Sequence, residues 1–300
     1  MAHGPIGAQL WADDTWETFR TTWFGPSGIE RLAVLLRPAP AVSDEDAFRD
    51  MLFDEIKILR NLEHPNVERL LESGSTDGVP WLLFDDVEGR TLEDVMRTAR
   101  DKSIAIPLPL ATWIVSRVAS GLAYAHGFTL HGNEPLGIVH RDVSPRHIHL
   151  GWDGSVRLGG FALARPASRI MSTRAGIIKG RFSYMSPEQV TGHPLTPLSD
   201  AFSCGAILYE LATGTQPFRG ESSFGVLEAI RTCQPEPPET HPYIAKAIDR
   251  CLCLMPMRIG AAELAATLEA WVVEQPEPGS PRGLTRLLRA LYDPEALERG

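Results

Sequence analysis

Lysine is scarce in this sequence, and none occurs before Lys57. The 300 residues include 29 lysines and arginines, of which only Lys57, Lys102, Lys179 and Lys246 are lysines. The formal net charge of −9 disfavours a generally basic nucleic-acid binder and a protein held on an anionic membrane surface. Any function that depends on a lysine upstream of Lys57 is excluded.

Cysteines and long apolar runs are also few. Cys251 and Cys253 are too close for a zinc knuckle and have no matching pair, so we expect them, with Cys204 and Cys233, to be reduced and buried. No run approaches the roughly eighteen apolar residues of a membrane span, and the N-terminus lacks the features of a signal peptide. We therefore predict a cytoplasmic protein.

Residues 1–42 alternate short apolar runs with turn residues. Trp16–Phe24 and Arg31–Arg37 are typical of strands, joined by the turn sequence Gly-Pro-Ser-Gly at 25–28. An acidic stretch from Ser43 then opens a helical pattern. Two more strand candidates surround residues 73–78. The pattern predicts a small β-rich lobe with one helix.

From Leu92 onward the pattern is mainly helical. Two short β segments, Ile148–Leu150 and Val156–Leu158, interrupt it. The predicted helices are Leu110–His126, Pro197–Thr213, Ser223–Thr232, Ile244–Leu254 and Ala261–Val273. We predict an α+β fold with a β-rich N-terminal lobe and hinge at 1–88 and a larger helical lobe at 89–273.

Residues 274–300 form a third segment. A proline-rich linker precedes Leu284, Leu287, Leu288 and Leu291, which are spaced i, i+3, i+4, i+7 as on one face of a helix. Two interpretations remain open. The helix packs back on the body, or it docks a partner protein.

Several short motifs occur in one order along the chain. His140-Arg141-Asp142 is followed by Ser186-Pro187-Glu188, and then by Ser199-Asp200. In this order and spacing, the motifs resemble those of the eukaryotic-like, Hanks-type Ser/Thr protein kinases of bacteria, over about residues 8–272. Further matches are Glu55 on the small-lobe helix, His64-Pro65-Asn66 after it, the hinge from Phe84 to Gly89, and Arg258 late in the large lobe.

The resemblance implies a two-lobed kinase fold and assigns roles to residues. Asp142 would accept a hydroxyl proton, next to His140 and Arg141 in the catalytic loop. Asp200 would brace that loop, and Arg258 would pair with Glu188. Arg141 would also read a phosphorylated activation loop, within which the candidate phosphate acceptors are Ser168, Ser172 and Thr173.

The residues that hold ATP phosphates in such kinases are missing from the first lobe. Trp11, Asp13 and Trp16 stand where glycines should let backbone N–H groups approach phosphate, so they add bulk and negative charge. Leu35 takes the place of the strand lysine. Glu55, the usual partner of that lysine, is retained. Arg37 and Arg20 are the conceivable substitutes, and either arginine could instead be solvated, or Arg37 could pair with Glu55.

The magnesium ligands are missing as well. Gly160 replaces the aspartate of Asp-Phe-Gly, and His147 replaces the asparagine of the catalytic loop, although magnesium prefers oxygen ligands. Ser144 replaces a catalytic-loop lysine. The adenine pocket would have His149 as its floor and a bulky Phe84 at the gatekeeper position. A transition-metal site at His147 and His149 would lack a third ligand.

These losses favour a pseudokinase that acts as a scaffold or allosteric regulator. Its partner would be another protein, such as an active kinase or a substrate of one, and we expect no cofactor. One alternative is an atypical Ser/Thr kinase that uses Asp142, ATP and magnesium with Arg37 or Arg20 as the cation. Another is a sensor that binds a nucleotide without metal.

Overall fold

The computed structural model describes residues 4–25, 28–43, 46–129, 135–161 and 182–292. The chain divides into two compact units, Met1–Val87 and Glu88–Gly300, called here the N-lobe and the C-lobe. The predicted α+β class, with a β-rich lobe followed by a helical one, is confirmed. The division falls one residue before the predicted boundary. The segment 274–300, which was predicted as a separate part, belongs to the second unit.

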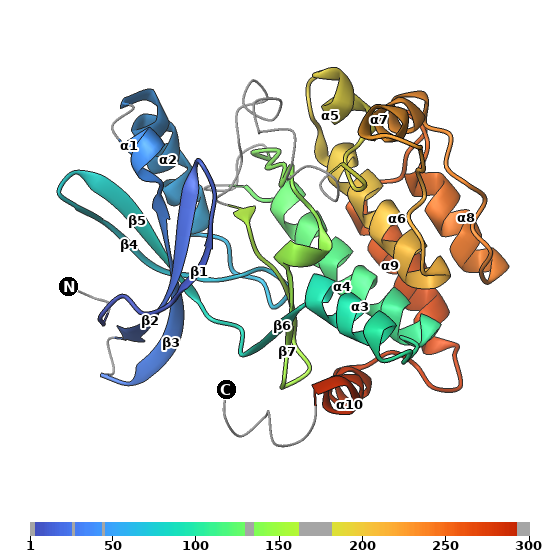
Figure 1. Cartoon of the computed structure of the whole chain (residues 1–300), viewed down its shortest axis with the longest axis horizontal. Coiled ribbons are helices and arrows are strands. Elements are labelled where there is room, and N and C mark those ends of the chain that lie inside the picture. Colours follow the sequence, from blue (N-terminus) through green and yellow to red (C-terminus); the bar gives the residue numbers. More distant parts are fainter. Residues whose placement is uncertain (1–3, 26–27, 44–45, 130–134, 162–181, 293–300) are drawn as a thin grey trace. The chain divides into compact units, whose positions relative to one another are not determined.

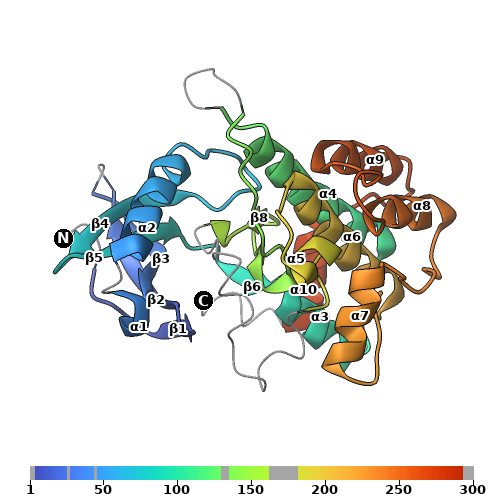
Figure 2. The ribbon, with the colours of Figure 1, turned by 90° about the horizontal axis from the view of Figure 1, so that it is seen from above.

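A five-stranded antiparallel sheet with the order β1-β2-β3-β5-β4 forms the N-lobe. The helix α2 (Asp46–Leu59) contacts β5 and lies beside the sheet in both views (Figures 1 and 2). The remaining elements are β1 (Gln9–Ala12), β2 (Trp16–Phe24), β3 (Glu30–Pro38), the short helix α1 (Pro40–Ser43), β4 (Leu70–Thr76) and β5 (Val79–Asp85).

The two faces of this sheet carry different side chains. Side chains alternate along a strand, and paired residues share a face. Leu35 lies opposite Leu83, and together with Ala33 they form a buried cluster made of strand residues only, rimmed by half-buried Phe19, Trp23, Leu71 and Trp81. Phe84 lies opposite Val34, on the other face. Since α2 contacts β5 and none of its described side chains joins the Leu35 cluster, we infer that its buried side chains cover the Phe84 face.

The C-lobe begins with a small antiparallel sheet of order β6-β7-β8 and continues with helices (Figure 1). The strands are β6 (Gly89–Thr91), β7 (Ile148–Gly151) and β8 (Val156–Leu158), and a 3-10 turn, η1 (Pro145–His147), leads into β7. The helices are α3 (Leu92–Asp101), α4 (Leu108–His126), α5 (Pro187–Thr191), α6 (Pro197–Thr213), α7 (Ser223–Thr232), α8 (Pro242–Cys251), α9 (Ala261–Val273) and α10 (Pro281–Tyr292).

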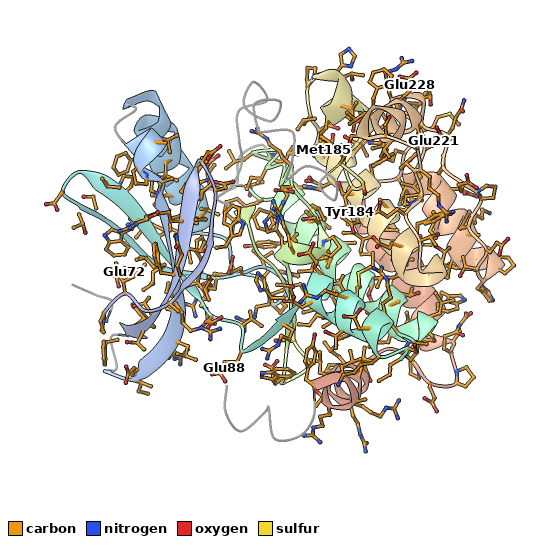
Figure 3. All side chains as sticks on the ribbon, in the orientation of Figure 1. Glu72, Glu88, Tyr184, Met185, Glu221 and Glu228 are labelled. Atoms are coloured by element: carbon orange, nitrogen blue, oxygen red, sulfur yellow. The ribbon has the colours of Figure 1, made fainter. Side chains whose placement is uncertain are left out.

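Helix α6 is the centre of the C-lobe. Twelve consecutive residues, Ser199–Glu210, are buried, because α4, α8 and α9 pack around the helix. The rings of Phe202 and Phe218 stack 5.7 Å apart. Tyr184, labelled in Figure 3, donates its hydroxyl to Glu210 Oε2 at 2.6 Å, and its carbonyl accepts the Ser203 hydroxyl. The chain that follows residue 181 is thereby fixed to α6.

A buried ion pair joins α5 to the loop before α9. Arg258 Nη1 lies 2.7 Å from Glu188 Oε1, and Arg258 and Glu188 are only 4% and 6% exposed. Arg258 also donates to the carbonyls of Leu198 and Cys253 and lies over the Phe202 ring. These contacts of the guanidinium are with hydrogen-bond acceptors or an aromatic face, which is how a buried charge is tolerated.

Helix α10 packs on the C-lobe. Its four leucines are buried, as in the interpretation that the helix returns to the body. Lys102 Nζ on the α3 side donates to the carbonyl of Leu291, and Tyr292 bonds to Thr98 of α3. Gly154 meets Pro281 so closely that a Cβ there would lie 2.4 Å from the proline carbonyl oxygen. The apolar face of α10 is occupied within the chain.

Two further expectations concern membranes and cysteines. Across the described ranges, the helices are too short or too polar to cross a bilayer. Cys204 and Cys251 are buried, Cys233 and Cys253 are half-buried, and all four are free thiols. Burial raises the pKa of Cys233 to about 11 and that of Cys251 to about 12, so both thiols are protonated at neutral pH.

Arg258→Ala is expected to lower the free energy of unfolding by about 3–5 kcal/mol, because Glu188 would remain as an uncompensated buried charge. The matched control is Arg250→Ala, which breaks the exposed pair with Glu263 and should cost less than about 1 kcal/mol. Urea titration of both variants measures the difference. Equal losses would contradict the assignment of the buried pair as a stabilising contact.

The same pair predicts a pH dependence. Burial alone would raise the pKa of Glu188, but hydrogen bonds from Arg258 and Ser199 outweigh it and lower the pKa below the ordinary 4.5. A lowered folded-state pKa stabilises the fold above the ordinary value, and that contribution is lost as the pH falls through the folded-state pKa. The wild type should therefore lose stability below pH 4.5 more steeply than Arg258→Ala.

Candidate functional site

The loop 140–147 is held by one buried carboxylate. Asp200, near the start of α6, is 1% exposed. Its two oxygens accept the backbone N–H groups of His140 at 2.8 Å and Arg141 at 2.9 Å, and His126 Nε2 lies 2.8 Å from Oδ2. Arg141 has a positive φ of 69°, which the two bonds around it help to maintain. Asp200 therefore fixes the backbone that presents Asp142.

His140 is buried and neutral at neutral pH. Burial lowers its pKa, and Nε2 lies 2.7 Å from the carbonyl oxygen of Gly159, so Nε2 carries the proton. Nδ1 accepts the N–H of Asp142 at 3.3 Å, and the ring meets Phe161 edge-on with centroids 4.5 Å apart. These contacts tie the loop to the segment after β8, so the role of His140 is to position the loop.

The Asp142 carboxylate is bound by a cation of its own loop. Arg146 Nη2 lies 2.7 Å from Asp142 Oδ2, and both side chains are partly exposed. His147 Nδ1 lies 3.9 Å from the same oxygen. A hydroxyl proton donor that approaches Asp142 Oδ2 therefore meets an oxygen that already accepts a charge-assisted hydrogen bond.

His147 and Gly160 lie against each other. The His147 Nδ1 group donates to the Asp142 carbonyl at 2.8 Å, and Gly159 N–H donates to the His147 carbonyl. Gly160 has a φ of +86°, and a Cβ placed on it would lie 3.1 Å from Cγ of His147. Burial lowers the pKa of His147 to about 4, so the imidazole is neutral. The ring thus occupies space that a side chain at position 160 would need.

Comparison with known proteins identifies the family. The protein kinase domain matches residues 37–268, which is most of the chain. This chain belongs to the protein kinase domain family. It is 33% identical over 237 residues to the tyrosine-protein kinase MasK of Myxococcus xanthus, covering 79% of this chain and 37% of MasK.

Other bacterial relatives carry serine/threonine kinase names. One is the probable serine/threonine-protein kinase CE0033 of Corynebacterium efficiens, which is 34% identical over 66% of this chain and 29% of its own length. Another is the serine/threonine-protein kinase PknL of Mycobacterium tuberculosis, which is 32% identical over 57% of this chain and 40% of its own length. The chain therefore spans less than half the length of these curated relatives.

The kinase-domain match begins at Arg37, after the strands in which a glycine-rich loop is expected. At that loop position the Asp13 Oδ1 atom accepts the N–H groups of Thr15 at 2.7 Å and Trp16 at 2.8 Å. Backbone N–H groups of this kind are what a phosphate-binding loop offers its ligand. In this chain, the β1–β2 turn gives two of them to its own carboxylate.

The strand register corrects one sequence assignment. Leu35 and Phe84, assigned above to one nucleotide pocket, lie on opposite faces of the sheet, because Leu35 pairs with Leu83 and Phe84 faces Val34. The β3 residues on the Phe84 face are Val34, directly opposite Phe84, and Leu36, which is buried. A slip of one residue moves a side chain to the other face. A β3 lysine that faces Phe84 would therefore stand at Val34 or Leu36, and neither position holds a lysine.

The two arginines considered as substitute cations are both engaged within the N-lobe. Arg37 lies on the Leu35 face, 2.8 Å from Glu17 and over the Phe19 ring, rather than paired with Glu55. Arg20 lies on the Phe84 face, and its Nε is 3.1 Å from Asp86 Oδ2. Of the two, only Arg20 shares a face with Phe84.

The other predicted nucleotide-site residues fall in both lobes. Trp11 and Trp16 share the Phe84 face, and Trp16 is 2% exposed. Glu55 is half-buried on α2. His149 is half-buried on β7, where burial lowers its pKa to about 4. Arg141 has an exposed side chain, while Ser168, Ser172 and Thr173, which it was expected to serve, lie outside the described residues.

Magnesium is implied by the family, but the residues present do not fit it. Its two expected ligand positions hold a neutral imidazole and a glycine, and neither supplies the oxygen donor that magnesium prefers. In the parts of the chain that the structure describes, no three histidine, cysteine, aspartate or glutamate side chains are grouped to hold a metal ion. No chemical step is therefore assigned to a metal here.

Sequence reasoning missed three functional contacts. The ion pair of Asp142 with Arg146 joins a loop residue to a residue of the 3-10 turn η1, so no helical spacing indicated it. The carboxylate of Asp13, two residues before Thr15, could have indicated a turn that binds its own amides. Nothing local predicted that His126, at the end of α4, contacts Asp200, because 74 residues separate them.

A substitution series tests the contact between Gly160 and His147. Gly160→Ala should destabilise the fold by about 1–3 kcal/mol, through left-handed backbone strain and crowding against the imidazole. Gly192→Ala is the matched control, because Gly192 has a φ of +70° and nothing within 4 Å of its Cβ position. In a His147→Ala background, the excess cost of Gly160→Ala over Gly192→Ala should disappear. A Gly160→Ala cost no larger than that of the control would contradict the crowding.

Proposed function

We propose that this chain is a pseudokinase, a protein kinase domain that transfers little or no phosphate and acts by binding other proteins. The observation that carries the proposal is the contact of His147 with Gly160, at the two positions from which oxygen ligands would reach magnesium. The role is that of a scaffold or allosteric regulator. The fitting partners are an active kinase or a substrate of one.

The N-lobe supports the same proposal independently. Phosphoryl transfer depends on charge stabilisation by a lysine, by metal ions and by loop amides. None of the candidate lysine positions Val34, Leu35 and Leu36 holds a lysine, and two amides of the β1–β2 turn are bound to Asp13. One arginine finger alone is worth about 10³–10⁵ in rate, so the loss of several such groups removes useful turnover.

A second candidate is an atypical protein kinase, and the retained Asp142 favours it. The loop around Asp142 is held by Asp200 in a defined conformation, and the curated relatives are named as kinases. In this candidate Arg20 would leave Asp86 to serve as the missing cation. Arg146 would also have to release Asp142.

Thermal unfolding with nucleotide separates these functions. We expect the melting temperature of the chain to stay within about 1 °C when ATP is added, with magnesium or with EDTA. A ligand at 100 times its dissociation constant stabilises by about 2.7 kcal/mol, which is very roughly 5–10 °C for a domain of this size. A kinase domain that keeps its lysine and Asp-Phe-Gly serves as the positive control.

A shift that requires magnesium would contradict the pseudokinase proposal and favour the atypical kinase. A shift that persists in EDTA would favour a metal-independent nucleotide sensor. In that case Asp13→Ala should enlarge the shift, because it releases the N–H groups of Thr15 and Trp16.

Phosphate transfer gives the second test. Incubation with radiolabelled ATP and magnesium should label the wild type no more than Asp142→Asn, which keeps the size of the side chain and removes its charge. Labelling of the wild type that disappears in Asp142→Asn would establish catalysis by this loop. Labelling that is equal in both would point to a contaminating kinase and leave the proposal standing.

A further inference from the structure

Helix α10 lies beyond the end of the kinase-domain match at residue 268 and carries an unusual charge. Between Pro281 and Tyr292 there are three arginines and no acidic residue. The whole chain has a net charge of −9, so the residues outside α10 together carry −12. Helix α10 is therefore a positively charged helix in a chain whose net charge is negative.

The three arginines, Arg282, Arg286 and Arg289, lie on one face of α10. At 3.6 residues per turn, these positions fall within about 60° of one another around the helix axis. All three are exposed, whereas the leucines of the opposite face are buried. They are called here the arginine stripe.

The stripe is held rigidly toward solvent. The buried leucines, the Lys102–Leu291 hydrogen bond and the Tyr292–Thr98 hydrogen bond fix α10 on the C-lobe. Arg90 reinforces this end, because its guanidinium lies about 5 Å from the rings of both Trp152 and Tyr292. A rigid helix loses little entropy when a ligand binds, which favours recognition.

Helix stability accounts for one arginine of the stripe, Arg289 in the last turn, where a positive charge suits the helix dipole, but not for the other two. Arg282 lies in the first turn, where a positive charge opposes the helix dipole. Arg286 pairs with Glu277 at 3.3 Å, but both side chains are at least three-quarters exposed, and such pairs contribute little. The arrangement is therefore better explained by a binding role.

We propose that the arginine stripe is a docking surface for an acidic segment of a partner protein. The guanidinium groups recur along the helix at steps of about 6 and 4.5 Å. An extended peptide advances about 3.4 Å per residue, so carboxylates placed one or two residues apart can match these steps. Arginine suits such a ligand because it binds carboxylates in a bidentate manner.

Other polyanions fit this surface less well. A membrane would require the apolar face of α10, which is packed against the C-lobe. A nucleic acid or an anionic bilayer also extends well beyond one short helix and would meet the negative remainder of the chain. A short acidic segment is small enough to contact the arginine stripe without reaching the negatively charged remainder of the chain. The inference holds whether or not the chain transfers phosphate.

The test uses the full chain without nucleotide and a fluorescein-labelled peptide of four alternating Glu-Ser pairs. Fluorescence anisotropy at low salt should give saturable binding that weakens as salt is added. The variant Arg282→Gln/Arg286→Gln/Arg289→Gln should raise the dissociation constant at least about tenfold. Glutamine is a good helix former, so the melting temperature of this variant should match the wild type.

The matched control is Arg31→Gln/Arg219→Gln/Arg231→Gln, which makes the same charge change at exposed arginines elsewhere. It should leave the dissociation constant within about twofold. The proposal is overturned if the wild type does not bind the peptide below about 1 mM, or if the control loses as much affinity. Stripe-dependent binding to phosphatidylserine vesicles or to an oligonucleotide, tighter than to the peptide, would also overturn it.

Discussion

One buried carboxylate, that of Asp200, organises the functional part of the C-lobe. It sits near the start of α6, the most buried helix, and accepts bonds from two consecutive loop amides and from His126 of α4. Because α6 is fixed by the core, the loop is fixed as well. This explains how the loop 140–147 holds a defined conformation although the positions expected for a lysine and for magnesium ligands carry other residues. The backbone conformation of this loop depends on Asp200, whereas phosphate transfer would depend on other residues.

The degraded positions are occupied by groups that the chain satisfies internally. Asp13 binds the amides of its own turn, Arg146 binds Asp142, and the ring of His147 lies against Gly160. Each contact joins residues that lie close in the sequence. Asp13 and Asp142 bind groups two to four residues away, and the His147–Gly160 contact spans the β7–β8 hairpin. The proposed loss of catalysis would therefore rest on several separate contacts. Restoring one missing catalytic residue would leave the other contacts in place.

The sequence predicted the order of the lobes and most element boundaries, since apolar spacing and turn residues decide these locally. Trp16–Phe24 and Pro197–Thr213 match their predicted bounds. The kinase resemblance also led to the pairing of Glu188 with Arg258, whose Nη1 and Oε1 atoms lie 2.7 Å apart in the structure. Strand register was less accessible, since placing Leu36 rather than Leu35 on the Phe84 face requires knowing which residues pair across strands. Contacts over long separations, such as His126 with Asp200, leave no local pattern.

The turn around Asp13 has one more consequence. A carboxylate tethered two residues from the amides it binds has an effective concentration far above that of any dissolved anion. The carboxylate therefore competes with any dissolved anion for these two amides. Under the proposed function, a change in the state of the cell would reach the chain through its protein partners, and ATP supply would act on it only through them.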